Sequence, residues 1–308
     1  MANDHSSAPA TAAAVRVGIV GIGNMGFALA ERLRGLGWPL AVRDIDPRRT
    51  RDAAAIGASV CASALELAAR CDCIIVCVVD ARQTKTVLFG ERGVMASLAP
   101  GSTVMLCPTM APDEVERFTR QLRRRGTDCI DAPMSGGPAR ARDGTMSLMI
   151  ACAHAVFERH RALIEALSNK VFRIGERPGD AARTKLVNNL AAAINLAGAC
   201  EATALAERLG LDAARTLDVI EQSSGQSWIG SDRLRRAVAG DLAPRAHTTF
   251  LAKDSRLAIE AARAAGFDTP LGSLAAAIFA RACDDGCAAL DDASLLAWIR
   301  SRDATRTS

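Results

Sequence analysis

The stretch Val15-Arg-Val-Gly-Ile-Val20, followed at once by Gly21-Ile-Gly-Asn-Met-Gly26, decides the fold. The first six residues are mostly β-branched and apolar, which is typical of a strand buried on both faces. Apolar residues then recur at helical spacing over residues 27–36, so a helix follows the glycines. A second apolar run, residues 39–43, ends at Asp44, 23 residues after the first glycine. This order of strand, glycine loop, helix, strand and acid predicts a dinucleotide-binding unit.

Each glycine of this loop has its own physical reason. Gly21 permits a tight turn, Gly23 lets the backbone approach a pyrophosphate, and Gly26 allows the helix to pack closely on the strand. The amino end of the helix adds a partial positive charge. Asp44 is expected to accept from both ribose hydroxyls and to repel a 2′-phosphate, which favours NAD over NADP. Three nearby basic residues soften that preference: Arg43, Arg48 and Arg49.

Strands and helices continue to alternate through the first half of the chain. Further strands are predicted at residues 59–60, 73–79, 103–107 and 128–130. Three helices are predicted between them: one that begins near residue 47, one that ends at residue 70, and one over residues 112–125. This alternation predicts a parallel sheet with right-handed crossovers. Beyond Gly179 only helical Ala/Leu periodicity remains. We therefore expect an α/β fold, a Rossmann-type doubly wound parallel sheet followed by an all-helical C-terminal domain.

The length of 308 residues suits about two domains. The change of texture predicts a dinucleotide-binding domain over residues 15–178 and a helical substrate and dimerisation domain over residues 179–308. The first helix of the second domain, about residues 180–209, is expected to span about 45 Å, long enough to run between domains or subunits. Residues 1–14 contain no Lys or Arg and no apolar core, so we expect a disordered tail and not a targeting sequence.

Composition excludes several other classes of protein. Apolar residues make up 49% and charged residues 23%, which argues against disorder, collagen and coiled coils. The longest nearly uncharged apolar run, residues 190–200, is well short of the roughly 18 residues that a membrane span needs. The net charge is only +4, and the basic residues are scattered. We expect a small-molecule substrate and neither a nucleic-acid nor a membrane partner.

Ten cysteines stand mostly in apolar stretches, and only four histidines accompany them. This pattern is typical of buried thiols in a reducing compartment and not of a metal site. We therefore expect a cytoplasmic protein without a bound metal.

The chain has no tyrosine and very little lysine. The first absence excludes any mechanism with a Tyr proton donor. Of 38 basic residues, only four are lysines: Lys85, Lys170, Lys185 and Lys253. Arg cannot replace a lysine that must exchange a proton, because the guanidinium stays charged. The lysines are therefore candidates for chemistry, although Lys85 and Lys170 stand in ordinary contexts.

Lys185 lies in the segment Lys185-Leu-Val-Asn-Asn189 of the long helix. Residues four apart share a helix face, so Lys185 and Asn189 can point at one spot and polarise a carbonyl oxygen beside a nicotinamide. Two adjacent asparagines have poor helix propensity, which indicates a polar task. The alternative is a hydrogen-bond network between domains.

The segment Asp131-Ala-Pro-Met-Ser-Gly-Gly-Pro138 follows a strand end. Its small residues expose backbone amides, and Ser135 adds a further donor. Such a concavity suits a carboxylate, with Ser135, Gly136 and Gly137 as the substrate-binding residues. An ordinary turn is the alternative.

Four segments together resemble one family. These are the glycine loop at 21–26, Asp-Ala-Pro-Met-Ser-Gly-Gly at 131–137, Lys-Leu-Val-Asn-Asn at 185–189, and Phe-Leu-Ala-Lys-Asp at 250–254. In their order and spacing they resemble the β-hydroxyacid dehydrogenases, the 3-hydroxyisobutyrate dehydrogenase family, over residues 15 to about 300. The resemblance implies a Rossmann domain with a C-terminal domain like that of 6-phosphogluconate dehydrogenase. It also implies a homodimer or homotetramer and NAD(P)-dependent oxidation of a 3-hydroxy acid.

The resemblance also implies roles for individual residues. Lys185 is implied as the catalytic proton donor and acceptor, and Asn189 as its substrate-orienting partner. Cofactor contacts are implied for Gly21, Gly23, Asn24, Met25, Gly26, Asp44, Val79, Thr109 and Lys253. Leu290-Asp-Asp-Ala and Ser227-Trp228 look more like the branch that acts on four-carbon sugar acids such as threonate. We expect Trp228, with Gln226 and Ser227, to line the substrate pocket.

Three alternatives remain at this point. A histidine-dependent 2-hydroxyacid dehydrogenase needs a His paired with an acid, and only His247 stands where it could serve. Imine reductases resemble this architecture but generally lack the lysine, so Lys185 argues against them. A non-catalytic dinucleotide-sensing protein on the same fold is the third, because a fold does not by itself imply a reaction.

Overall fold

The computed structural model describes residues 15–304. The tail predicted at residues 1–14 lies outside the described residues. The chain divides into two compact units between Lys185 and Leu186. They are called the first unit and the second unit.

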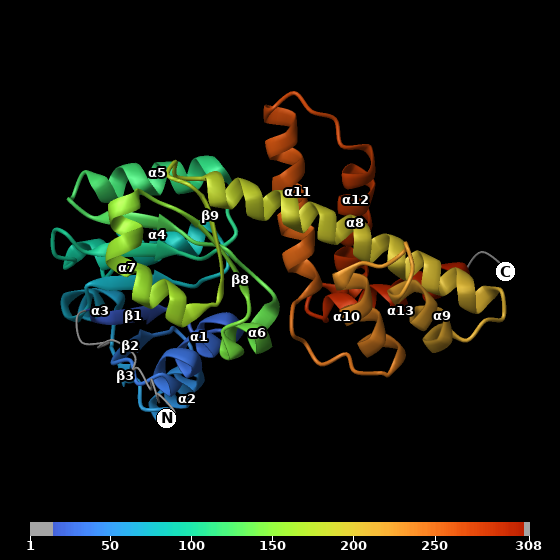
Figure 1. Ribbon diagram of the computed structural model, residues 1–308, viewed down its shortest axis with the longest axis horizontal. Helices are drawn as coiled ribbons and strands as arrows, with labels where there is room; N and C mark the ends of the chain where they lie inside the picture. Colours follow the sequence, from blue (N-terminus) through green and yellow to red (C-terminus); the bar gives the residue numbers. More distant parts are fainter. Residues whose placement is uncertain (1–14, 305–308) are drawn as a thin grey trace, which may run out of the picture. The chain divides into compact units, whose positions relative to one another are not determined.

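The first unit is built on one sheet of nine strands (Figure 1). Six parallel strands form its larger part, in the order β3-β2-β1-β4-β5-β6, with Ile19 of β1 level with Val42 of β2 and Ile75 of β4. Their bounds are β1 Val17–Val20, β2 Leu40–Arg43, β3 Ser59–Val60, β4 Cys73–Val76, β5 Thr103–Leu106 and β6 Asp128–Asp131. The predicted Rossmann-type sheet is confirmed.

Three further strands were not predicted, namely β7 (Met134–Ser135), β8 (Ser147–Ala151) and β9 (Lys170–Gly175). Strand β8 runs antiparallel to β6 and β7, and β9 pairs with β8 in parallel. The sheet is therefore mostly parallel. The pattern failed here because Leu and Met in β8 favour helix as readily as strand, and because β9 is largely exposed and lacks a buried run.

Helices cover both faces of the sheet. One face packs against α1 (Asn24–Gly35), α2 (Pro47–Ala55), α6 (Gly137–Asp143) and α7 (His154–Leu167), and the other against α3 (Ala64–Arg70), α4 (Ala81–Phe89) and α5 (Pro112–Arg123). Strand β4 shows the consequence, since Ile75 points into the first layer while Ile74 and Val76 point into the second. This is the doubly wound arrangement that continuous apolar strands predict.

The second unit is helical over its described residues, 186–304, apart from a single bridge between His247 and Asp291. Its helices are the later part of α8 (Asp180–Arg208), then α9 (Ala213–Glu221), α10 (Trp228–Val238), α11 (Thr248–Ala264), α12 (Pro270–Ala282) and α13 (Leu295–Ala304). Small residues of α8 share one hydrophobic cluster here with large ones such as Phe279 and Trp298. No helix within residues 15–304 is both long and apolar enough to cross a membrane.

All ten cysteines are free thiols, and eight of them are buried. Burial raises the pKa of Cys73 and of Cys77 to about 12. Both therefore remain protonated at neutral pH and behave as small apolar side chains.

Candidate functional site

The glycine loop has the shape that a pyrophosphate requires. Gly21 adopts φ +89°, and a side chain there would meet the carbonyl oxygen of Cys77 at 2.6 Å. A side chain on Gly26 would collide with the backbone of Gly21, whereas nothing lies within 4 Å of the equivalent position on Gly23. Two glycines are thus needed for backbone geometry and packing, and the third leaves the loop open. Asn24 and Met25 follow as the first two residues of α1.

The carboxylate of Asp44 is held beside this loop. Its Oδ2 accepts from the amide of Ile22 at 2.7 Å, and its Oδ1 accepts from the amide of Asp46 at 2.9 Å. The three neighbouring arginines each have a protein partner. Arg43 donates to the carbonyl oxygen of Asp44, Arg48 pairs with Asp46, and Arg49 donates to Asn24. The residues of this βαβ unit fit the adenosine half of a dinucleotide.

The remaining site residues of the first unit follow the carboxyl ends of neighbouring strands. Gly21 follows β1, Val79 follows β4 and Thr109 follows β5. Ser135 comes soon after β6. Because β1, β4, β5 and β6 are parallel, these ends lie along one edge of the sheet, where α/β proteins bind ligands.

The loop after β4 is stabilised by a reciprocal cap. Asp80 accepts from the amide of Gln83 at 2.8 Å, and the side chain of Gln83 accepts from the amide of Val79 at 3.1 Å. These bonds begin α4 and hold Val79 at the surface, with 44% of it exposed. The pair Val79-Asp80 is therefore held by the side chains of Asp80 and Gln83.

The segment predicted to bind a carboxylate forms a bend between β7 and α6. Ser135 pairs with Ser147 of β8, and the next two residues, Gly136 and Gly137, both have positive φ, +126° and +76°. A side chain on Gly137 would have no neighbour within 4 Å, so the backbone there is open. Consecutive amides in such a conformation can face an anion together.

Lys185 is the last residue of the first unit and lies in α8. It is buried, with 6% exposed, whereas Lys85 and Lys170 are exposed and Lys253 is half-buried. Lysine side chains are rarely this buried, so Lys185 differs from the other three lysines of the chain.

Asp131, the last residue of β6, has a role that sequence reasoning missed. Its Oδ2 accepts from the amides of Gly179 and Ala182, each at 3.0 Å, and only 2% of the residue is exposed. Burial raises the pKa of Asp131 to about 6, against the opposing effect of these amides. The carboxylate caps the first turn of α8. An available signal was that Gly179 precedes this helix without a side chain to cap it.

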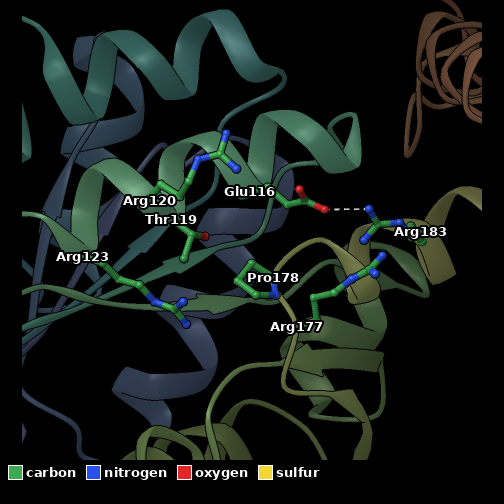
Figure 2. Close-up of a pocket in the computed structure, with 7 residues that line it drawn as sticks. All are labelled: Glu116, Thr119, Arg120, Arg123, Arg177, Pro178 and Arg183. Carbon is green, nitrogen blue, oxygen red and sulfur yellow. Dashed lines mark hydrogen bonds and ion pairs between the residues drawn. The ribbon is translucent and has the colours of Figure 1, made fainter.

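The outer side of the same turn carries charged side chains (Figure 2). Arg183 pairs with Glu116 of α5 at 2.6 Å and with Asp180 at 3.0 Å. A pocket of about 340 Å³ lies here, lined by Glu116, Thr119, Arg120, Arg123, Arg177, Pro178 and Arg183. The sequence predicts none of these as a site residue.

In the second unit, two predicted site residues meet at one acid. Asn189 donates from Nδ2 to Asp254 Oδ2 at 2.6 Å, and the Nζ of Lys253 lies 3.0 Å from Asp254 Oδ1. Asn189 Oδ1 also accepts from Asn188 at 3.0 Å. Asp254 is buried and thus orients both Asn189 and Lys253, a role that its place beside Lys253 in the sequence did not reveal.

Trp228 is the first residue of α10, and 46% of it is exposed. Ser227 caps this helix by accepting from the amide of Gly230 at 3.1 Å. The segment Leu290-Asp-Asp-Ala has a different task. Asp291 accepts from Arg236 at 2.9 Å and Asp292 from Arg233 at 2.6 Å, so the two acids anchor α10.

Two of the histidines make contacts that do not suit hydride-transfer chemistry. His247 bonds through Nδ1 with the carbonyl oxygen of Ala289 at 2.8 Å. His160 is buried against the hydroxyl of Thr103, and burial lowers its pKa to about 4. Neither contact is with a carboxylate.

Two family models match this chain. Residues 16–175 match the family model described as the NAD binding domain of 6-phosphogluconate dehydrogenase. Residues 179–299 match the model described as NAD-binding of NADP-dependent 3-hydroxyisobutyrate dehydrogenase.

Individual relatives cover nearly the whole chain. L-threonate dehydrogenase of Cupriavidus necator is 34% identical over 280 residues, 91% of this chain and 94% of that protein. L-threonate dehydrogenase of Escherichia coli strain K12 is 35% identical over 289 residues, 93% of this chain and 95% of that protein. The crystal structure of a 3-hydroxyisobutyrate dehydrogenase from Salmonella typhimurium has a TM-score of 0.86 and 33% identity, and the match covers 91% of this chain and 98% of that one. The chain therefore belongs to the β-hydroxyacid dehydrogenase family, the NAD(P)-dependent oxidoreductases related to 3-hydroxyisobutyrate dehydrogenase.

Proposed function

We propose that this protein transfers a hydride reversibly between a nicotinamide cofactor and the carbon bearing the 3-hydroxyl of a small acid, with threonate as the first candidate. The observation that carries the proposal is the burial of Lys185 in α8, a helix whose first turn is bonded to the end of β6. The carboxylate-binding bend begins four residues after that strand end, at Ser135.

In this proposal Ser135, Gly136 and Gly137 bind the substrate carboxylate, Asn189 orients the hydroxyl and Trp228 lines the pocket. The cofactor is bound by Gly21, Gly23, Asn24, Met25, Gly26, Asp44, Val79, Thr109 and Lys253. NAD is the preferred cofactor, because the Asp44 carboxylate stands at the end of β2 while Arg43, Arg48 and Arg49 are bonded to groups of the protein.

When bound, the nicotinamide accepts or returns the hydride. Lys185 handles the accompanying proton. In oxidation its uncharged amine accepts the proton of the substrate hydroxyl, and in reduction its ammonium donates a proton to the developing alkoxide. Oxidation therefore needs the uncharged amine, and its rate rises with pH. The carboxylate-binding bend holds the reacting carbon in place during both steps.

The wider setting follows the family. Residues 15–178 bind the cofactor, and residues 179–308 complete the substrate site and join copies of the chain in a homodimer or homotetramer. Ten free cysteines, most of them buried, suit a reducing compartment, and the cytoplasm is the proposed location.

The test is a panel of threonate, 3-hydroxyisobutyrate, glycerate and serine, each with NAD and with NADP, followed by the absorbance of the reduced nicotinamide. We expect turnover with at least one acid and a higher kcat/KM with NAD. Lys185→Ala should lower kcat about 10²- to 10⁴-fold, whereas Lys85→Ala, at an exposed lysine, should not. Full activity of a Lys185→Ala variant that still binds cofactor contradicts the assignment.

A further inference from the structure

We propose that Asp131 is a positioning residue for the hydride-transfer reaction proposed above. It holds the first turn of α8, and with it Lys185, in place relative to the carboxylate-binding bend. The inference rests on that proposed function, and all of the residues involved belong to the first unit.

The start of α8 lacks a cap of its own. The first amides of any helix have no acceptor within the helix, and a side chain of the preceding residue usually supplies one. Here that residue is Gly179, whose φ of +89° suits glycine and which has no side chain to offer. Asp131, 48 residues earlier in the chain, supplies the acceptor to Gly179 and Ala182 through one oxygen. The cap is therefore tertiary, and it ties the helix to the end of a central strand.

The same strand end also carries the bend that is proposed to bind substrate. Ser135 lies four residues after Asp131 and pairs with β8. The amide of Met149 in β8 donates to the carbonyl oxygen of Pro133 at 3.1 Å. Ala181 of α8 packs against Met149 and Ala151. The bend and the helix start are thus built on one strand pair, with Asp131 as the buried polar link between them.

The charged side chains on the outside of the turn are poor substitutes for this link. The side chains in the pairs that Arg183 makes with Glu116 and Asp180 are each about one-third exposed. Figure 2 shows the pair with Glu116. Exposed pairs are screened by solvent and held by flexible side chains, so they contribute little. The buried carboxylate has neither weakness.

Lys185 lies only three residues after Ala182, a rise of about 4.5 Å along the helix. A shift of the first turn is therefore passed to the lysine almost undiminished. In enzymes a misplacement of about 1 Å can cost about 10²-fold in rate, because reacting groups must meet at the correct distance and angle. Loss of the cap should therefore lower kcat more than it weakens the binding of the cofactor.

The experiment compares Asp131→Ala, Asp131→Asn and a matched control, Asp212→Ala. Asp212 caps α9 by accepting from the amide of Arg215 at 2.8 Å, and α9 carries no proposed site residue. Asp131→Ala is expected to lower kcat about 10- to 100-fold and to leave the dissociation constant of the cofactor within about twofold. Asp131→Asn should recover most of the loss, because Asn caps helices about as well as Asp. The control should keep the parent kcat.

Two further readouts do not need activity. Hydrogen exchange of the amides of residues 179–182 should accelerate in Asp131→Ala, and acylation of Lys185 by an amine-reactive reagent should become faster than in the parent and the control. If the parent oxidises no hydroxy acid, the proposed function fails, and these two readouts still test the cap. A folded Asp131→Ala variant with parental kcat overturns the inference, as does an equal loss of kcat in the control. Should Asp131→Ala not fold, the Asp131→Asn variant decides. Unchanged Lys185 labelling and a parental kcat in Asp131→Asn support the inference, and complete loss of kcat in that variant overturns it.

Discussion

Each unit contains a buried aspartate that holds chain segments together, and the two aspartates differ in their ionisation. Asp131 in the first unit meets backbone amides only, and burial raises its pKa to about 6. Burial also acts to raise the pKa of Asp291 in the second unit. There the amides of Arg245, Ala293 and Ala246 and the guanidinium of Arg236 outweigh burial and leave the pKa lowered.

The difference shows that burial alone does not determine the charge of an internal carboxylate. Both residues are almost inaccessible, with 2% and 0% exposed. What separates them is the number and the charge of the donors they meet, since hydrogen bonds to the ionised form favour it and desolvation opposes it. The negative charge of Asp180 near Asp131 adds to the separation. Asp131 thus serves as a cap whose charge is costly, whereas Asp291 serves as a stable ionic anchor.

The largest expected effect is in the second unit. Asp291→Ala would leave Arg236 buried without its main partner and three amides without an acceptor, at a cost of about 3–5 kcal/mol in the free energy of unfolding. Chemical denaturation measures the total, and hydrogen exchange in α10 localises it. The matched control is Asp241→Ala, which removes the exposed partner of Arg245 and should cost less than about 1 kcal/mol. Equal losses in both variants would remove the contrast between anchor and surface pair.

The pH dependence of stability gives the second effect. Because the folded-state pKa of Asp131, about 6, lies above the unfolded value of about 3.9, its favourable contribution is present below about pH 4 and is lost as pH rises through 6. Asp131→Asn does not titrate, so its stability relative to the parent should rise by up to about 3 kcal/mol between pH 4 and 7. Asp292, with a pKa also raised to about 6, is present in both proteins and cancels in the difference.

Asp291→Asn should behave in the opposite way. With a lowered pKa, Asp291 stabilises the folded state above its unfolded pKa and loses that contribution as pH falls further. The free energy of unfolding of Asp291→Asn, relative to that of the parent, should therefore be lower at neutral pH than at low pH. A flat difference between parent and Asp131→Asn over pH 4 to 7 would contradict the raised pKa of Asp131.

The smallest effect concerns the outside of the first turn of α8. Arg183→Gln removes the pairs with Glu116 and Asp180 and should lower the free energy of unfolding by less than about 1 kcal/mol, with kcat unchanged. Added salt should reduce this difference in the free energy of unfolding between parent and Arg183→Gln further. A loss of kcat as large as that of Asp131→Ala would show that the outer pairs, and not the buried cap, hold the turn.

Local patterns predicted the elements whose reasons are local. The glycine loop, the strand before it and Asp44 were predicted because turn, packing and strand end are encoded within about thirty residues of one another. Strands β8 and β9 were not, because Leu and Met in β8 favour helix as readily as strand, and because β9, which pairs with β8, is largely exposed and lacks a buried run. The two aspartates of Leu290-Asp-Asp-Ala suggested a branch of the family, yet their contacts with Arg233 and Arg236 are structural.

Which amino acids are available for chemistry followed from composition: a chain without tyrosine and with four lysines leaves few groups that can exchange a proton near neutral pH. Folding alone decided that Lys185, of the four lysines, becomes buried, that Asp131 caps its helix from 48 residues away, and that Asp254 orients Asn189 from 65 residues away. The reason is that a hydrogen bond depends on distance in space. Burial and pairing between segments far apart in the chain arise only when the strands and helices have packed.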